Sequence, residues 1–133
     1  MLGVIRDDPA VAAIAGTRVS AVAEAPPSVK LIDTAATRRP FGPGSGRIGM
    51  QLVLMVARCY GPDSPTGAIT ARQLAGTVSD ALDGKGAQRS GTRYVARANA
   101  PEIDGMSRDP ETKWPYYDVR LEIYAAAQAV PIA

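Results

Sequence analysis

The segment from Arg47 to Tyr60 constrains the fold more than any other part of this chain. Both of its alternating sets of residues are apolar, so an extended strand here has two apolar faces. One set contains Ile48, Met50, Leu52, Leu54 and Val56, and the other contains Val53, Met55, Ala57 and Cys59. A strand with two apolar faces is covered on both sides. The sequence therefore predicts a central strand that packs against helices or against a neighbouring subunit.

The segment near the C-terminus has the alternation of a half-buried strand. Apolar residues face one way at Tyr117, Val119, Leu121, Ile123 and Ala125, and mostly polar residues face the other way at Tyr116, Asp118, Arg120, Glu122 and Tyr124. This pattern is typical of an antiparallel strand with one solvated or partner-facing side. Further strands are expected at 19–24, 29–33 and 92–99.

Two stretches have the spacing of amphipathic helices. In the longer one, apolar residues recur at intervals of three and four, at Leu74, Ala75, Val78, Ala81 and Leu82. It is expected to begin near Thr66 or Thr70 and to end at Gly84 and Gly86. A short N-terminal helix is expected after Asp7 or Asp8, with Pro9 at its first position and Gly16 at its exit.

Together these elements predict an α+β fold. We expect a mostly antiparallel sheet of four to five strands, with one main amphipathic helix and a short N-terminal helix packed on it. The length of 133 residues suits one domain, which we assign to 1–133, with long loops at about 34–46 and 100–113.

Several classes of function are disfavoured by composition. The chain has no His, so it has neither a Ser-His-Asp nor a Cys-His arrangement, and the commonest transition-metal ligand is missing. Its one cysteine, Cys59, cannot form an internal disulfide and lies in an apolar segment, which indicates a small buried hydrophobe. We therefore expect no catalytic residue, no metal and no cofactor.

The sequence shows no targeting signal and no strong positive charge. Residues 1–8 lack the basic start and apolar run of a signal peptide, and the apolar stretch 50–57 is too short to span a membrane. The net charge of +2 is well below that of a typical nucleic-acid binder.

A Gly-rich run at 42–46 lies between Arg38, Arg39 and Arg47. It is not a phosphate-binding P-loop, because no Lys follows it and it leads into a strand rather than a helix. The arginines are expected to contact carboxylates of a neighbouring chain or to stay solvated, and contact with a DNA backbone is a minor alternative. Phe41 is the only aromatic residue in this loop, so a base-stacking platform is not supported.

The second polar connection contains four carboxylates, at Glu102, Asp104, Asp109 and Glu111. Their spacing does not match a calcium loop, and Arg108 and Lys113 are interspersed, so a solvated, salt-bridged loop is favoured over a metal site. The aromatic cluster that follows begins with Trp114, a packing anchor or an interface residue. The candidate contact residues are Arg38, Arg39, Phe41, Arg47, Arg108, Asp109, Glu111, Lys113, Trp114, Tyr116 and Tyr117.

In order, four segments resemble the tail terminator (tail completion) proteins of long-tailed bacteriophages. They are DDPAVAAIAGTRV, the strand ending in VARCYG, the helix ITARQLAGTVSDALDG and the late strand SRDPETKWPYYDVRLEIYA. The chain departs from the family pattern in its short N-terminal helix and its Arg/Gly/Pro loop at 34–46.

The resemblance implies an α+β subunit of a hexameric ring on the tail tube, which stops tube polymerisation and joins the tail to the head. The implied partners are further copies of the chain, the tail tube protein and a head-tail connector or stopper protein, with genomic DNA passing through the ring. The implied location is the neck of the virion, after assembly in the host cytoplasm.

Three alternatives remain open from sequence. A head-closure or head-tail connector protein is similarly small and ring-forming. A small-molecule enzyme or binding domain needs a pocket with convergent polar groups, and the sequence shows no such cluster. A DNA-binding module predicts a steep loss of affinity with salt.

Overall fold

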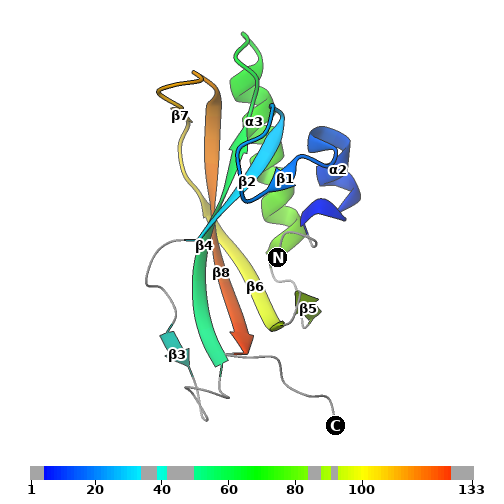
Figure 1. Cartoon of the computed structure of the whole chain (residues 1–133), viewed down its shortest axis with the longest axis vertical. Coiled ribbons are helices and arrows are strands. Elements are labelled where there is room, and N and C mark those ends of the chain that lie inside the picture. Colours follow the sequence, from blue (N-terminus) through cyan, green and yellow to red (C-terminus); the bar gives the residue numbers. More distant parts are fainter. Residues whose placement is uncertain (1–4, 34–38, 42–49, 84–87, 91–92, 127–133) are drawn as a thin grey trace.

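The computed structural model describes residues 5–33, 39–41, 50–83, 88–90 and 93–126 (Figure 1). Two helices and eight strands are defined in these segments. The helices are α2 (Pro9–Ala15) and α3 (Gly67–Leu82). The strands are β1 (Val19–Ser20), β2 (Ser28–Asp33), β3 (Arg39–Phe41), β4 (Met50–Tyr60), β5 (Gln88–Ser90), β6 (Arg93–Ile103), β7 (Ser107–Arg108) and β8 (Pro115–Ala126).

The strands form one sheet in the order β1-β2-β4-β8-β6-β5, and all of its pairings are antiparallel except β1 with β2. β3 also pairs with β4, and β7 also pairs with β8. The α+β fold predicted from sequence is confirmed. The sheet has more strands than the predicted four to five, because the long central strands β4 and β8 each pair with two shorter strands along one edge.

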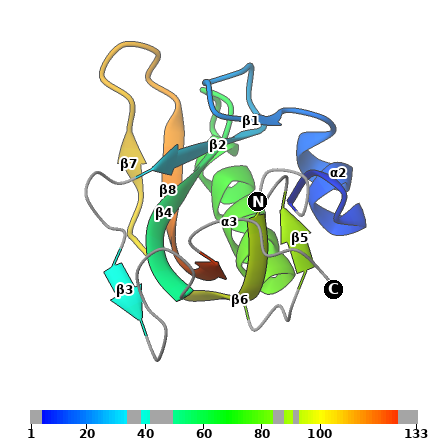
Figure 2. The ribbon, with the colours of Figure 1, turned by 60° about the horizontal axis from the view of Figure 1, so that its bottom comes forward.

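The core lies between α3 and one face of the sheet, which we call the inner face. Figure 2 shows α3 lying against the curved sheet, with α2 beside it. The predicted helix stripe is confirmed, since Leu74, Ala75, Val78 and Leu82 are fully buried and Ala81 packs against them. The inner face supplies Val29, Leu31, Ala57, Cys59, Val119, Leu121 and Ile123. These are the apolar alternate residues of β2, β4 and β8.

The N-terminal helix has the ends predicted for it. Asp8 is its N-cap, and the side chain of Asp8 accepts hydrogen bonds from the backbone N–H groups of Ala10 and Val11. Pro9 opens the helix, and Gly16 closes it with a φ of 60°, a value that suits glycine. Val11 and Ala15 face the core, so α2 extends the helical layer.

Some predicted strands and loops differ from the observed elements. The strand predicted at 19–24 is only Val19–Ser20, because a turn held by the Ser20 side chain begins at once. The strand predicted at 92–99 continues to Ile103, and β7 divides the polar connection predicted at 100–113. β3 lies within the loop predicted at 34–46, whose other residues are outside the described segments.

The two faces of the central strand differ in their covering. α3 covers the inner face of β4, and no described helix packs on the opposite face, so covering of that face by a neighbouring subunit stays a prediction. In addition, neither described helix is long and apolar enough to cross a membrane.

Candidate assembly surface

The strand pairings align side chains in rows across the face of the sheet opposite α3, which we call the outer face. Because side chains alternate along a strand, the residues that precede and follow each inner residue point to the outer face. The rows are Ser28, Tyr60 and Tyr116, then Lys30, Arg58 and Asp118, then Ile32, Val56 and Arg120. This face combines an aromatic end, an ion pair and a row in which two partly exposed aliphatic side chains lie beside the exposed Arg120.

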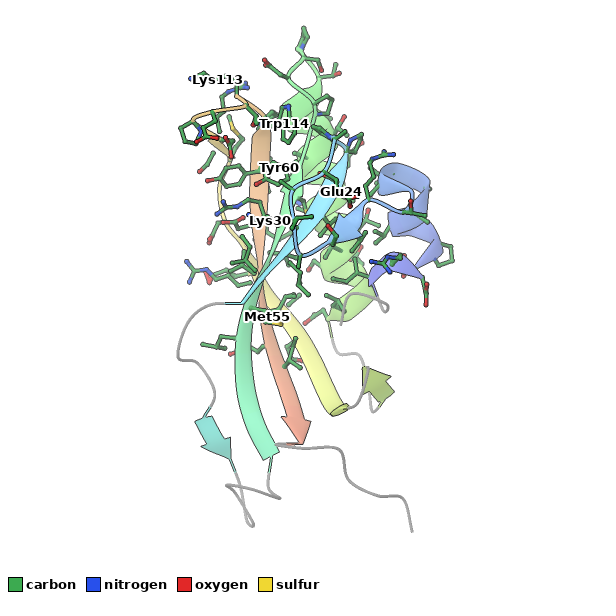
Figure 3. All side chains as sticks on the ribbon, in the orientation of Figure 1. Glu24, Lys30, Met55, Tyr60, Lys113 and Trp114 are labelled. Carbon is green, nitrogen blue, oxygen red and sulfur yellow. The ribbon has the colours of Figure 1, made fainter. Side chains whose placement is uncertain are left out.

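The aromatic end is built around Tyr60, the last residue of β4. The ring of Tyr60 makes edge contacts with the rings of Trp114 and Tyr116, each at 5.7 Å between centroids. Tyr60 is only 2% exposed, and this burial raises the pKa of its hydroxyl. Edge-to-face contacts add to the stabilisation that burial of the rings provides. Trp114 is thereby fixed at the start of β8 (Figure 3).

The next row is held by an ion pair between β4 and β8. Arg58 Nε donates to Asp118 Oδ1 at 2.9 Å, and Arg58 Nη2 donates to Asp118 Oδ2 at 3.1 Å. The guanidinium also lies over the Tyr116 ring, with Cζ 4.1 Å from the ring centroid. The hydrogen bonds to Asp118 raise the pKa of Arg58, so the residue stays charged. A two-point contact of this kind fixes the orientation of both side chains.

The turn between β7 and β8 forms a hairpin end beside the aromatic residues. Asp109 Oδ1 accepts hydrogen bonds from the backbone N–H groups of Glu111 at 2.9 Å and Thr112 at 3.0 Å. These bonds lower the pKa of Asp109, because they favour its charged form. The backbone N–H of Lys113 donates to the Asp109 carbonyl, and Lys113 has a φ of 66°. The turn therefore has a defined shape although its side chains are mostly exposed.

Arg108 connects this hairpin with the turn that precedes α3. Its Nη1 donates to the Lys113 carbonyl at 3.0 Å and lies 3.9 Å from Asp63 Oδ1. Both side chains of the ion pair are about half exposed or more, at 48% and 61%, so the pair adds little to stability.

The carboxylates of the second polar connection take two separate roles. Glu102 and Asp104 lie 3.9 Å and 3.2 Å from nitrogen atoms of Arg120, as expected for a salt-bridged surface. Asp109 instead holds the hairpin turn. Among the residues described, no three His, Cys, Asp or Glu side chains are grouped closely enough to hold a metal ion.

The candidate contact residues are not all on one surface. Arg108, Asp109, Glu111, Lys113, Trp114 and Tyr116 come together at the hairpin end and the adjacent outer face. Tyr117 lies on the inner face instead and packs against the core. Arg39 and Phe41 lie in β3, but their side chains, and Arg38 and Arg47 altogether, are outside the described parts of the structure.

Sequence reasoning did not pair Arg58 with Asp118 or identify Tyr60 as the centre of the aromatic end. The alternation in each strand shows which residues share a face. The pairing itself depends on the register between strands 60 positions apart, for which a single sequence carries no signal. The buried character predicted for Cys59 is confirmed, and burial raises the pKa of its thiol.

Comparison with known proteins finds one informative similarity. No family model and no curated protein sequence matches this chain. Among solved structures, the fold is similar to that of a chain in the virion of a native gene transfer agent (GTA) particle, with a TM-score of 0.64. The similarity covers 92% of this chain and 89% of the other, at 23% sequence identity. At this identity the comparison establishes a shared fold over nearly the whole of both chains.

Proposed function

We propose that this chain is a structural protein of a phage-type virion that forms a ring at the head-proximal end of the tail tube. There it ends polymerisation of the tube and joins the tail to the head connector. The observation that carries the proposal is the fold similarity to a chain of a gene transfer agent virion, which leaves little of either chain unmatched. The ordered sequence motifs that resemble tail terminators support this particular role within the virion.

The geometry of the surface supports assembly rather than catalysis. Among the described residues, the shifted pKa values belong to groups with structural roles: Arg58 in its ion pair, Asp109 in its turn, and Tyr60 and Cys59 in packed surroundings. The outer face carries ordered aromatic and charged side chains suited to a protein contact. Its partners in this proposal are further copies of the chain, the tail tube protein and a connector or stopper protein.

A ring subunit needs two different surfaces that meet head to tail. The sheet offers two distinct sides for this purpose, since the β7–β8 hairpin borders β8 and the β1–β2 loop borders β2, with β4 between them. In the proposed ring, genomic DNA passes through the opening without sequence-specific contacts. The finished protein is located in the neck of the virion, after assembly in the host cytoplasm.

The decisive experiment mixes the purified protein with tail tube protein from the same virus and measures tube lengths by electron microscopy. We expect substoichiometric protein to shorten the tubes, with label at one tube end only. Unimpeded tube growth together with binding to the head connector would instead assign the chain to head closure. The affinity of the purified protein for DNA, measured at two salt concentrations, tests the DNA-binding alternative, which predicts a steep loss of affinity with salt.

A further inference from the structure

Two charged side chains of the outer face, Lys30 on β2 and Glu122 on β8, have no ion pair within the described segments. The other ion pairs of this face join Arg58 with Asp118, and Arg120 with Glu102 and Asp104. Lys30 and Glu122 are half-buried, so their stems lie against the sheet. Their charged atoms are reachable from outside, because neither is among the enclosed polar atoms that lack a hydrogen-bond partner.

Lys30 lies directly opposite another cation. In the antiparallel pairing of β2 with β4, Lys30 is the partner of Arg58. Like charges in this position repel each other and destabilise the pairing of the strands. Asp118 binds Arg58 in a two-point contact and forms no ion pair with Lys30. The surface around Lys30 therefore keeps a positive charge, which a carboxylate from outside the chain would neutralise.

The register of the sheet places Lys30 and Glu122 symmetrically about Val56. Lys30 pairs with Arg58 and Glu122 pairs with Leu54, and Val56 lies midway between these two residues of β4. The two charges thus lie on opposite sides of Val56, each one strand away and two residues along. Their separation is about 10 Å across the strands and about 14 Å along them. Val56 is itself partly exposed, so the point midway between the charges is apolar.

We propose that two copies of the chain pair through their outer faces about a two-fold axis at Val56. The axis lies between the two faces, at right angles to the line from Lys30 to Glu122. Because these groups carry opposite charges at equal distances from Val56, the rotation brings Lys30 of each copy over Glu122 of the other. The two contacts are identical, and the partly exposed Ile32, Leu54 and Val56 side chains are covered between them.

This pairing goes beyond the proposed function, because it is not the contact that closes a ring. A two-fold contact uses the same surface on both copies and is complete with two, whereas a ring needs two different surfaces that meet head to tail. The pairing therefore predicts that the free chain forms dimers. It also predicts that a ring formed in solution is doubled, with the outer faces of two rings in contact.

The test is a charge exchange, followed by self-association of the full chain in analytical ultracentrifugation. We expect Lys30→Glu and Glu122→Lys each to weaken pairing by about tenfold or more, because the symmetry places like charges in both contacts. The double variant should recover to within about threefold of the original chain, because the pairs are restored in reverse. Arg72→Glu and Asp80→Lys are the matched controls, since they make the same charge changes at exposed positions of α3, on the other side of the sheet.

Circular dichroism and thermal unfolding check the fold of each variant. Lys30→Gln and Glu122→Gln are milder variants that carry the test where an exchange variant fails to fold. Each should keep the melting temperature of the chain and weaken pairing by about threefold or more.

A chain that stays monomeric, or that forms a single ring without doubling, would overturn the pairing. It would also be overturned by a double variant that does not recover, or by control variants that weaken pairing as much as the exchanges do. Loss of tail tube protein binding in Lys30→Glu, with no dimer of the original chain, would assign the outer face to that partner instead. A chain that shortens tail tubes without pairing would retain the proposed function and lose only this contact.

Discussion

At the turn between β4 and α3, Gly61 and Gly67 let two backbone segments approach closely. A Cβ atom added to Gly61 would lie 1.9 Å from the carbonyl oxygen of Gly67, and a Cβ on Gly67 would lie 1.7 Å from that of Pro62. Both obstacles are backbone atoms, which cannot move aside as a flexible side chain does. The Gly61 N–H also donates to the Pro115 carbonyl at 2.8 Å, so this approach joins β4, α3 and β8.

We expect Gly61→Ala to lower the free energy of unfolding by about 3 kcal/mol, as overpacking of a closed site does. Urea denaturation measures the change. Gly105→Ala is the matched control, because a Cβ there meets nothing within 4 Å. Equal stability of the two variants would show that the turn can open without cost.

The ion pair of Arg58 and Asp118 gives a second comparison at this scale. The two side chains are 28% and 17% exposed, so they are shielded from solvent far more than Arg120 and Asp104 at 59% and 38%. We expect Asp118→Asn to lower the free energy of unfolding by about 2 kcal/mol, since it leaves the guanidinium without its counter-charge.

Asp104→Asn serves as the control for this substitution, with an expected loss of about 0.5 kcal/mol or less, because exposed ion pairs contribute little. Chemical denaturation at neutral pH separates the two variants. A loss for Asp104→Asn as large as that for Asp118→Asn would contradict the role given to shielding.

At the scale of elements, the β7–β8 hairpin depends on one side chain that accepts two backbone hydrogen bonds. The pKa of Asp109 is lowered by the two N–H groups that it accepts in the turn. A carboxylate with a lowered pKa stabilises the fold above its ordinary pKa of about 3.9, and this contribution disappears as the pH falls through the lowered value. The hairpin should therefore loosen at acidic pH before the core does.

We expect Asp109→Asn to keep the hairpin at neutral pH, because the amide oxygen still accepts both N–H groups, and to remove its acid sensitivity. Asp109→Ala should loosen the hairpin at every pH. Hydrogen exchange of the Glu111 and Thr112 amides, followed from pH 6 downward and corrected for intrinsic rates, measures both effects. An acid response that persists in Asp109→Asn would assign it to another group.

The elements themselves were largely predictable from sequence. Spacing of apolar residues identified α3, β2, β4 and the inner face of β8, because burial of one stripe or of alternate residues leaves a direct record in the sequence. The short strands β3 and β7 were taken for loops, since two or three residues carry no usable periodicity. Their existence depends on pairing with a long neighbour, which local sequence does not encode.

The candidate site was less predictable than the fold. The turn residues from Arg108 to Lys113 stood out by their charges, and Trp114 by its aromatic neighbours. Tyr117 was assigned to the same surface, but alternation along β8 turns it to the inner face.

For the whole molecule, the described core of the sheet lies beside α3. It contains Val29 and Leu31 of β2, Ala57 and Cys59 of β4, and Val119, Leu121 and Ile123 of β8, with Met55 packed against them. In Figure 1, β4 and β8 continue beyond α3, with β3 beside β4. The segment that contains β3 can therefore be removed without loss of a described core residue.

Deletion of residues 36–45 tests whether the segment that contains β3 is needed for the fold. Asp33 pairs with Met55, so the shortened chain must still reach Met50, about 17 Å further along β4. The six residues that remain between them span about 20 Å when extended, so the connection can close. We expect the free energy of unfolding to change by less than about 1 kcal/mol, because no described core residue is lost.

Self-association, in contrast, should weaken in this deletion. The removed segment contains Arg38 and Arg39, which are predicted to contact carboxylates of a neighbouring chain. Static light scattering measures the mass of the assembly, and thermal unfolding measures the fold. A folded variant with unchanged mass would contradict a role of this segment in the subunit contact. A variant that fails to fold would instead show that the segment contributes to the fold.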